Sequence, residues 1–159
     1  METIANSRIV PVQEDLTLED LRLSIQRGLE KMFRVDKKYA PGVTLELGEW
    51  GVLQNDGTVA RPGATPVAET YLVFCGTERF DARATGQVTL LMNSNLIVKS
   101  SRFEPDSYAV GMALCVKNLG ADAAHVSPAS AGEFVCGKVL EVGNGYLVYE
   151  VFASQFKMA

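Results

Sequence analysis

From Pro41 onward, apolar residues recur at every second position in short segments that end at Gly, Asn, Asp or Pro. This period sends alternate side chains to opposite faces of a strand, and short strands between turn residues are typical of an antiparallel sandwich or barrel. Residues 41–159 therefore predict a mainly β domain, either an antiparallel β-sandwich or a jelly-roll or barrel-like fold. The segments that fit a strand are 43–47, 50–53, 58–60, 70–76, 87–92, 95–103, 112–117, 134–142 and 146–152.

The clearest single element is a hairpin in the segment "GKVLEVGNGYLVYEVF", which begins at Gly137. Its Asn144-Gly145 pair predicts a type I′ turn, because that turn needs a positive φ at both central residues and its twist matches the strands. The turn fixes the register of the two strands. On the face that we expect in the core, it aligns Val142 with Leu147, Leu140 with Tyr149, and Lys138 with Val151.

The opposite face of this hairpin mixes apolar and charged residues. It pairs Glu141 with Val148 and Val139 with Glu150, which is neither a clean solvent face nor a clean core face. β-Branched residues suit an exposed pleated surface, which explains the face without a partner. The other explanation is a partner that covers it, so these four residues are candidates for an interface.

The residues before Pro41 lack the two-residue period. Residues 1–15 predict an N-terminal arm that is ordered only when something holds it. Thr17 and Asp20 resemble a capping box, and apolar residues then recur at helical spacing. Residues 16–40 therefore predict one amphipathic helix with a linker, in which the basic residues 31–39 form a solvated helix end. The apolar stripe of this helix consists of Leu18, Leu21, Ile25, Leu29 and Met32.

Three further segments predict turns or loops. Asn55-Asp56-Gly57 and Asn93-Ser94 each predict a hairpin between the strands that flank them. Residues 121–132 are rich in small side chains and predict a long surface loop.

Length and charge exclude several classes of protein. A chain of 159 residues predicts one domain that buries enough surface to fold without disulfides or metals. The net charge of −4, with both signs mixed along the chain, argues against a nucleic-acid partner. Apolar runs are far shorter than the ~20 residues that span a bilayer, and the first residues lack the apolar stretch of a signal peptide. We therefore expect no membrane partner and synthesis in a cytoplasm.

The residues that carry chemistry in other proteins form no recognisable motif here. Cys75, Cys115 and Cys136 lie far apart in apolar segments and predict buried, unpaired thiols. His125 is the single histidine, and its neighbour Ser127 does not complete a pattern of nucleophile and base. The expectation is a protein that is no enzyme and has no cofactor and no metal site.

Two other groups of residues can be explained either by solvation and packing or by a functional role. Carboxylates pair in the sequence at turns or strand ends, where solvation is the default: Glu46 with Glu49, Glu78 with Asp81, and Glu104 with Asp106. The aromatic residues fit either the mouth of a ligand-binding barrel or the core and an interface. They are Trp50, Tyr71, Tyr108, Tyr146 and Tyr149.

The C-terminal half of the chain resembles a known family in two runs. These are "YLVFCGTERFDARATGQVTLLMNSNLIVKSSRFEPDSYAVGMALCV", from Tyr71, and "AGEFVCGKVLEVGNGYLVYEVF", from Ala131. A strand with a glycine and charged corner, a "GQVTLL" strand, a "SYAVGMAL" turn and a final hairpin follow one another. This succession is similar to small virion proteins of tailed bacteriophages, in particular head decoration or cement proteins.

The resemblance implies a protein that binds the outer surface of an icosahedral capsid and holds coat subunits together. The implied partners are the major capsid protein and further copies of the chain, as a trimer or dimer. The implied location is the virion, after synthesis in the cytoplasm of a host bacterium. Candidates for capsid or oligomer contacts are Arg8, Ile9, Val10 and Val12 of the arm, Leu21 and Ile25 of the expected helix, and Val139, Glu141, Val148 and Glu150 of the hairpin.

Two alternatives remain open at the level of the sequence. One is a cytoplasmic β-barrel that binds a small ligand at its mouth. The other is a different phage structural subunit, of a tail tube or a head fibre. The state of the chain in solution would distinguish these functions. A ligand-binding barrel is expected as a monomer with a pocket, a tail subunit as a head-to-tail polymer, and a decoration protein as a small closed oligomer.

Overall fold

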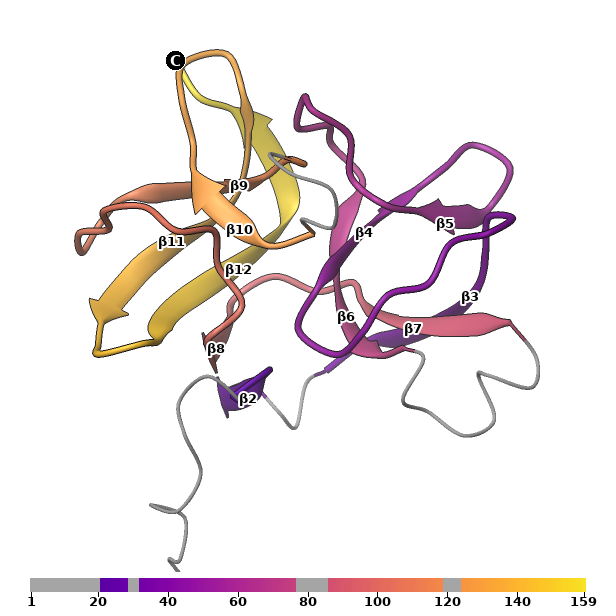
Figure 1. The fold of residues 1–159 in the computed structure, drawn as a ribbon, viewed down its shortest axis with the longest axis horizontal. Helices are drawn as coiled ribbons and strands as arrows, with labels where there is room; N and C mark the ends of the chain where they lie inside the picture. Colours follow the sequence, from indigo (N-terminus) through magenta and orange to yellow (C-terminus); the bar gives the residue numbers. More distant parts are fainter. Residues whose placement is uncertain (1–20, 29–31, 77–85, 119–123) are drawn as a thin grey trace, which may run out of the picture.

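The computed structural model describes residues 21–28, 32–76, 86–118 and 124–159, with no account of the side chains of residues 153 and 154. These residues form two β bodies that lie side by side (Figure 1). One is an open six-stranded sheet and the other is a closed barrel. The fold is mainly β, as the sequence predicts, with antiparallel pairing in the sheet and a small closed barrel beside it.

The six-stranded sheet is antiparallel and is built around the C-terminal hairpin. Its strand order is β10 (Val126–Pro128), β9 (Ala113–Val116), β11 (Phe134–Val142), β12 (Leu147–Lys157), β8 (Leu96–Ser100) and β2 (Ser24–Arg27). Every pair of neighbours is antiparallel. The long hairpin β11–β12 is therefore central, and the short strands β10 and β2 are the two edges.

The barrel closes through one parallel pair. Its strands follow the order β3 (Arg34–Tyr39), β5 (Thr58–Ala60), β4 (Trp50–Leu53), β6 (Thr70–Cys75) and β7 (Gln87–Leu91), and β7 pairs with β3 again. β3 and β5 run parallel, with Tyr39 beside Val59. The other barrel pairs are antiparallel. Closure leaves the barrel without an edge strand.

Two clusters of buried residues fill the molecule. The first fills the barrel interior and consists of Leu45, Val59, Tyr71, Val73, Val88, Leu90 and Ala124. The second lies between the inner face of the sheet and the outside of the barrel, because it joins Trp50, Leu72 and Leu91 of the barrel strands to sheet residues such as Leu96 and Tyr149. One face of the sheet is thus covered by the barrel.

The hairpin turn lies where the sequence predicts it, but its type differs. Gly143 N–H donates to the carbonyl of Tyr146 at 2.9 Å, so Asn144 and Gly145 are the central residues of the turn. Gly145 has a positive φ of 86°, whereas Asn144 has none. The type I′ prediction is therefore wrong, because that turn needs a positive φ at both residues.

The predicted register holds next to the turn and fails beyond it. Val142 lies opposite Leu147, and Glu141 lies opposite Val148, as expected. A bulge at Leu140 then shifts the pairing by one residue, so that Val139 faces Tyr149 and Lys138 faces Glu150. A one-residue shift exchanges the two faces of a strand. Val139 is therefore fully buried in the core and does not lie on the mixed face.

The expected helix is wrong where the structure describes it. Residues 24–27 form the edge strand β2, which pairs with β8 and places Ile25 beside Val98. The apolar residues Leu21, Leu23 and Ile25 also alternate, so the segment fits a two-residue period as well as a helical one. Residues 34–39, expected as a helix end, form barrel strand β3. Long-range pairing overrides the local helical pattern here.

Of four other local predictions, one is confirmed and three change in the fold. The Asn55 to Gly57 turn joins β4 and β5 as a hairpin, as predicted. The Asn93-Ser94 segment makes no hairpin, because β7 belongs to the barrel and β8 to the sheet. The expected strand at 43–47 is irregular, and its Leu45 fills the barrel interior. The expected surface loop 121–132 contains β10, where Val126 and Ser127 are fully buried.

No residue in the described ranges is helical. It follows that the described part of the chain contains no helix of the length and apolarity needed to cross a membrane.

Candidate functional site

The outer face of the six-stranded sheet carries three of the four hairpin candidates. On β12, Leu147, Tyr149 and Val151 are buried against the barrel, so the residues between them point away from it. Val148 and Glu150 are these outward residues, and both are half-buried. Glu141 lies opposite Val148 and is exposed. We use "outer face" for the solvent-facing residues of β2, β8, β11 and β12, which are Ser24, Arg27, Ile97, Lys99, Lys138, Glu141, Val148 and Glu150.

The other predicted interface residues do not join this face. Arg8, Ile9, Val10 and Val12 lie outside the described residues. Leu21 is half-buried before β2, and its carbonyl accepts the backbone N–H of Ser101 at 2.6 Å. Ile25 packs against the core between sheet and barrel. Val139 is part of that core.

Sequence reasoning missed the residues of β8 and β2 that complete the outer face. Ile97 and Lys99 alternate with buried Leu96, Val98 and Ser100, so their outward direction was readable from the strand itself. The sequence alone did not indicate that β8 pairs with β12. The strand order decides which residues share a face.

His125 lies in a cluster of charges between the two bodies. Its Nε2 is 3.4 Å from Glu49 Oε2, and its Nδ1 is 4.0 Å from Glu104 Oε2. Glu49 precedes barrel strand β4, whereas Glu104 follows sheet strand β8. Arg61 Nη2 lies 3.9 Å from the same Glu49 oxygen. The imidazole therefore stands between one carboxylate of each body.

Backbone hydrogen bonds reinforce this junction. The N–H of Trp50 donates to the carbonyl of Ala124 at 2.9 Å, and the N–H of Glu104 donates to the carbonyl of Val126 at 2.8 Å. The segment that carries His125 is thus fixed on both sides. No hydroxyl or thiol of the described residues is hydrogen-bonded to the ring.

Glu49 is the buried acid of this cluster, although the sequence predicted a solvated pair with Glu46. It is 7% exposed, and its Oε1 accepts the N–H of Glu46 at 2.9 Å. Burial raises the pKa of Glu49, but the close contact with the His125 ring, the hydrogen bond from the Glu46 N–H and the charge of Arg61 outweigh burial and hold this pKa below its usual value. The carboxylate is therefore ionised and engaged.

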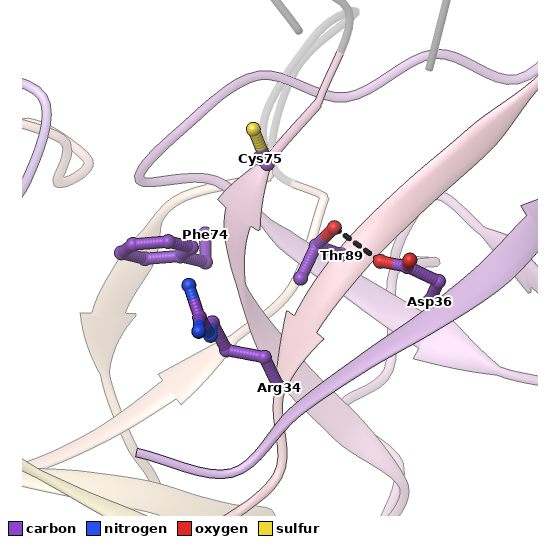
Figure 2. Close-up of a pocket in the computed structure, with 5 residues that line it drawn as sticks. All are labelled: Arg34, Asp36, Phe74, Cys75 and Thr89. Atoms are coloured by element: carbon purple, nitrogen blue, oxygen red, sulfur yellow. Dashed lines mark hydrogen bonds between the residues drawn. The ribbon is translucent and has the colours of Figure 1, made fainter. Parts of the chain in front are cut away.

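A cavity of about 380 Å³ lies on the outside of the barrel (Figure 2). It is lined by Arg34, Asp36, Phe74, Cys75 and Thr89, from strands β3, β6 and β7. The Arg34 guanidinium lies 5.7 Å from the centre of the Phe74 ring, and Thr89 Oγ1 donates to Asp36 Oδ1 at 2.5 Å. One cation, one anion and one aromatic face can bind a small polar molecule.

None of the three cysteines forms a disulfide, as predicted, but they are not equally buried. Cys115 and Cys136 are buried in the sheet, whereas Cys75 is half-buried beside the cavity. Burial raises the pKa of Cys115 to about 11 and raises that of Cys136 well above its usual value. Because the thiolate is the reactive form, both sheet thiols are poor nucleophiles.

Trp50 does not line a barrel mouth. It is fully buried between the two bodies, and its ring stacks on Tyr149 with centroids 6.4 Å apart. Tyr71 belongs to the barrel interior and donates its hydroxyl to Glu69 at 3.0 Å. Tyr146 lies beside the outer face, where the Lys99 ammonium is 4.2 Å from its ring centre. The ligand-mouth explanation therefore fails for Trp50 and Tyr149.

Within the described ranges, no three His, Cys, Asp or Glu side chains gather in a way that could hold a metal ion. Comparison of the chain with protein-family models, with curated proteins and with solved structures finds no match. The candidate sites therefore rest on the geometry of this chain alone.

Proposed function

We propose that the chain is a virion structural protein that decorates an icosahedral phage capsid as a homo-oligomer and stabilises it by bridging coat subunits. The resemblance of residues 71–152 to head decoration proteins motivates this function. The structural observation that supports it is the outer face, a surface shared by four neighbouring strands on which Ile97 and Val148 are only half-buried. Nothing in this function requires catalysis or a cofactor.

The physical mechanism is preferential binding to the assembled shell. A protein that binds only the intact lattice stabilises it by RT ln(1 + [L]/Kd), and an oligomer that contacts several coat subunits gains avidity. Modest individual contacts are therefore sufficient. Residues 1 to about 33 are proposed to carry much of the attachment, with the arm of residues 1–15 ordering along a coat groove. At the end of this segment, Phe33 is 60% exposed, which is unusual for so large an apolar side chain.

Removal of residues 1–15 tests the attachment. We expect the β bodies to stay folded by circular dichroism, while occupancy on purified capsids falls by more than roughly tenfold, equivalent to more than ~1.4 kcal/mol. His125→Ala serves as a comparison once circular dichroism shows that it is folded, because His125 lies at the junction of the two bodies and a decoration protein needs no catalytic histidine. Occupancy that is unchanged by the deletion would move the attachment to the β bodies, and a full-length chain that never binds shells would refute the function itself.

The barrel cavity favours a second candidate function, the binding of a small polar ligand. Arg34 and Asp36 offer opposite charges beside the Phe74 ring, which suits a small zwitterion. Thermal-shift screening with free amino acids would detect such binding, and Arg34→Ala should abolish any shift that depends on the cavity. A tail-tube or head-fibre subunit would instead form head-to-tail polymers, visible by electron microscopy.

A further inference from the structure

The outer face of the sheet carries two parallel rows of residues. The register places one row across four strands in the order Lys138, Glu150, Ile97, Arg27. The second row, two residues along β12, runs in the order Glu141, Val148, Lys99, Ser24. On β11, the first row begins with a cation and the second row begins with an anion.

We propose that this outer face binds the same face of a second copy of the chain. The proposed dimer has a twofold axis that lies between the two faces, crosses the strands and passes between the two rows. This inference rests on the proposed function, since it names the surface of the proposed homo-oligomer.

Charge complementarity selects this arrangement. A twofold axis that crosses the strands sets the first row of one copy against the second row of the other, so Lys138 meets Glu141 of the second copy. Symmetry repeats each contact, which gives two such pairs. An axis along β12 would instead place Glu150 on Glu150 of the second copy, and like charges directly opposite are unfavourable. Of these two orientations, the first avoids the like-charge contact and pairs opposite charges.

The apolar residues also match in this orientation. Ile97 would lie against the aliphatic stem of Lys99 of the second copy, and Val148 against the stem of Glu150 of the second copy. Ile97 and Val148 are only half-buried in the single chain, so association removes apolar surface from water. Stacked antiparallel sheets pack ~10 Å apart, close enough for these side chains to touch.

The charged groups of the second row are already held in place. Tyr146 donates its hydroxyl to Glu141 Oε2 at 2.7 Å, and the Lys99 ammonium lies over the Tyr146 ring. This chain of contacts orients Glu141 and Lys99 before a partner arrives, which lowers the entropy lost on binding. The eight residues of the outer face are fewer than the roughly 20–30 residues a side of a standard specific interface, so we expect a weak dimer that salt weakens further.

Charge-reversal variants test the pairing. Lys138→Glu leaves negative charge at both ends of the proposed pair, and Glu141→Lys leaves positive charge at both. We expect each variant alone to associate roughly tenfold more weakly than the natural chain by sedimentation equilibrium, with no capsid present. An equimolar mixture of the two should associate again, as should the double variant. Lys38→Glu makes the same charge change at an exposed position of the barrel strand β3 and should associate like the natural chain.

Thermal melting shows whether each variant is folded. Recovered association in the mixture would also show that both single variants are folded, because the mixture contains no other chain. A natural chain that stays monomeric at high micromolar concentration would overturn the inference, as would a mixture that associates no better than its components. Capsid occupancy is measured separately. A monomer that still binds shells would refute the dimer and leave the decoration function in place. A dimer that binds no shell would support the dimer and refute the decoration function.

Discussion

The barrel and the six-stranded sheet differ in how they pair their edge strands and bury their apolar residues. The barrel closes on itself through the parallel pair β3–β5, so its strands have no free edge and its apolar residues face an interior. The sheet stays open, with edges at β2 and β10, and a large apolar cluster lies on the face that packs on the barrel. Closure satisfies backbone groups internally, whereas an open sheet leaves a face and two edges for other contacts. The open sheet is therefore the body whose face and edges are available for the association that we propose.

The two bodies nevertheless share one core. Trp50 and Leu72 of the barrel pack with Leu96 and Tyr149 of the sheet, and His125 lies between carboxylates of both bodies. We therefore expect them to unfold together. The four predictions below test this comparison, from the largest expected effect to the smallest.

Gly76→Ala should be the most damaging substitution, because the backbone of the irregular segment that contains Leu45 passes directly beside Gly76, at the end of β6. A Cβ at Gly76 would lie 1.9 Å from the carbonyl oxygen of Leu45, and backbone cannot move aside cheaply. We expect a loss of about 3 kcal/mol or more in the free energy of unfolding, measured by denaturant titration. Gly63→Ala is the matched control, since no atom lies within 4 Å of its Cβ position. Similar losses for both would disprove the close approach.

Leu90→Ala and Leu72→Ala separate the barrel interior from the shared core. Both leucines are fully buried, and each change should cost about 2–5 kcal/mol by loss of packing. Thermal unfolding can be followed by circular dichroism for all strands and by the fluorescence of Trp50, the single tryptophan, for the shared core. One coincident transition is expected in both variants. A separate early transition for Leu90→Ala would mean that the barrel unfolds alone.

The Glu49 carboxylate predicts acid sensitivity at the junction. Its pKa is lowered in the folded chain, so the unfolded chain binds the proton more readily and the stabilising effect is present above the ordinary pKa of about 4.5. The effect is lost as the pH falls through the lowered pKa. Glu49→Gln should therefore flatten the fall in unfolding free energy between about pH 6 and pH 3.

Glu141→Gln, at an exposed position of the outer face, is the control for the acid titration, at concentrations where the chain is monomeric. Equal slopes for the natural chain and Glu49→Gln would argue that the cluster contributes nothing to the junction.

Thiol reactivity should distinguish the bodies with little change in stability. Cys75, half-buried on the barrel, should react with an aromatic disulfide reagent before Cys115 and Cys136, which are buried in the sheet and have raised pKa values. Three equivalents should react in denaturant. Cys75→Ser should remove the early phase, and an early phase that survives this change would place the reactive thiol in the sheet.

Local patterns predicted those features that depend on neighbouring residues. The strands at 70–75 and 134–142 and the turns at Gly57 and Gly145 follow from alternation and from glycine, and the structure has them. The hairpin register was predictable only as far as Glu141 and Val148. The bulge at Leu140 leaves no mark in the alternation, because "VLEV" contains apolar residues that suit either face.

Candidate sites were harder to predict than strands. His125 is separated in sequence by many residues from Glu49 and Glu104, and nothing local indicates that the three meet. The cavity residues Arg34 and Asp36 were assigned to a helix end, which hid their alternation on a barrel strand. A site that is assembled from several strands becomes visible only when the strand order is known.

The amino-acid sequence by itself determined that this protein is mainly β, where most of its strands lie and which side chains alternate along each strand, because these properties arise within a few residues. The tertiary structure decided which strand joins which body. It placed β7 in the barrel and β8 in the sheet across a short connection, and it turned residues 24–27 into a strand edge instead of a helix. The reason is that pairing partners are distant in the chain, and the burial that their pairing achieves outweighs the weak local preference of a short segment.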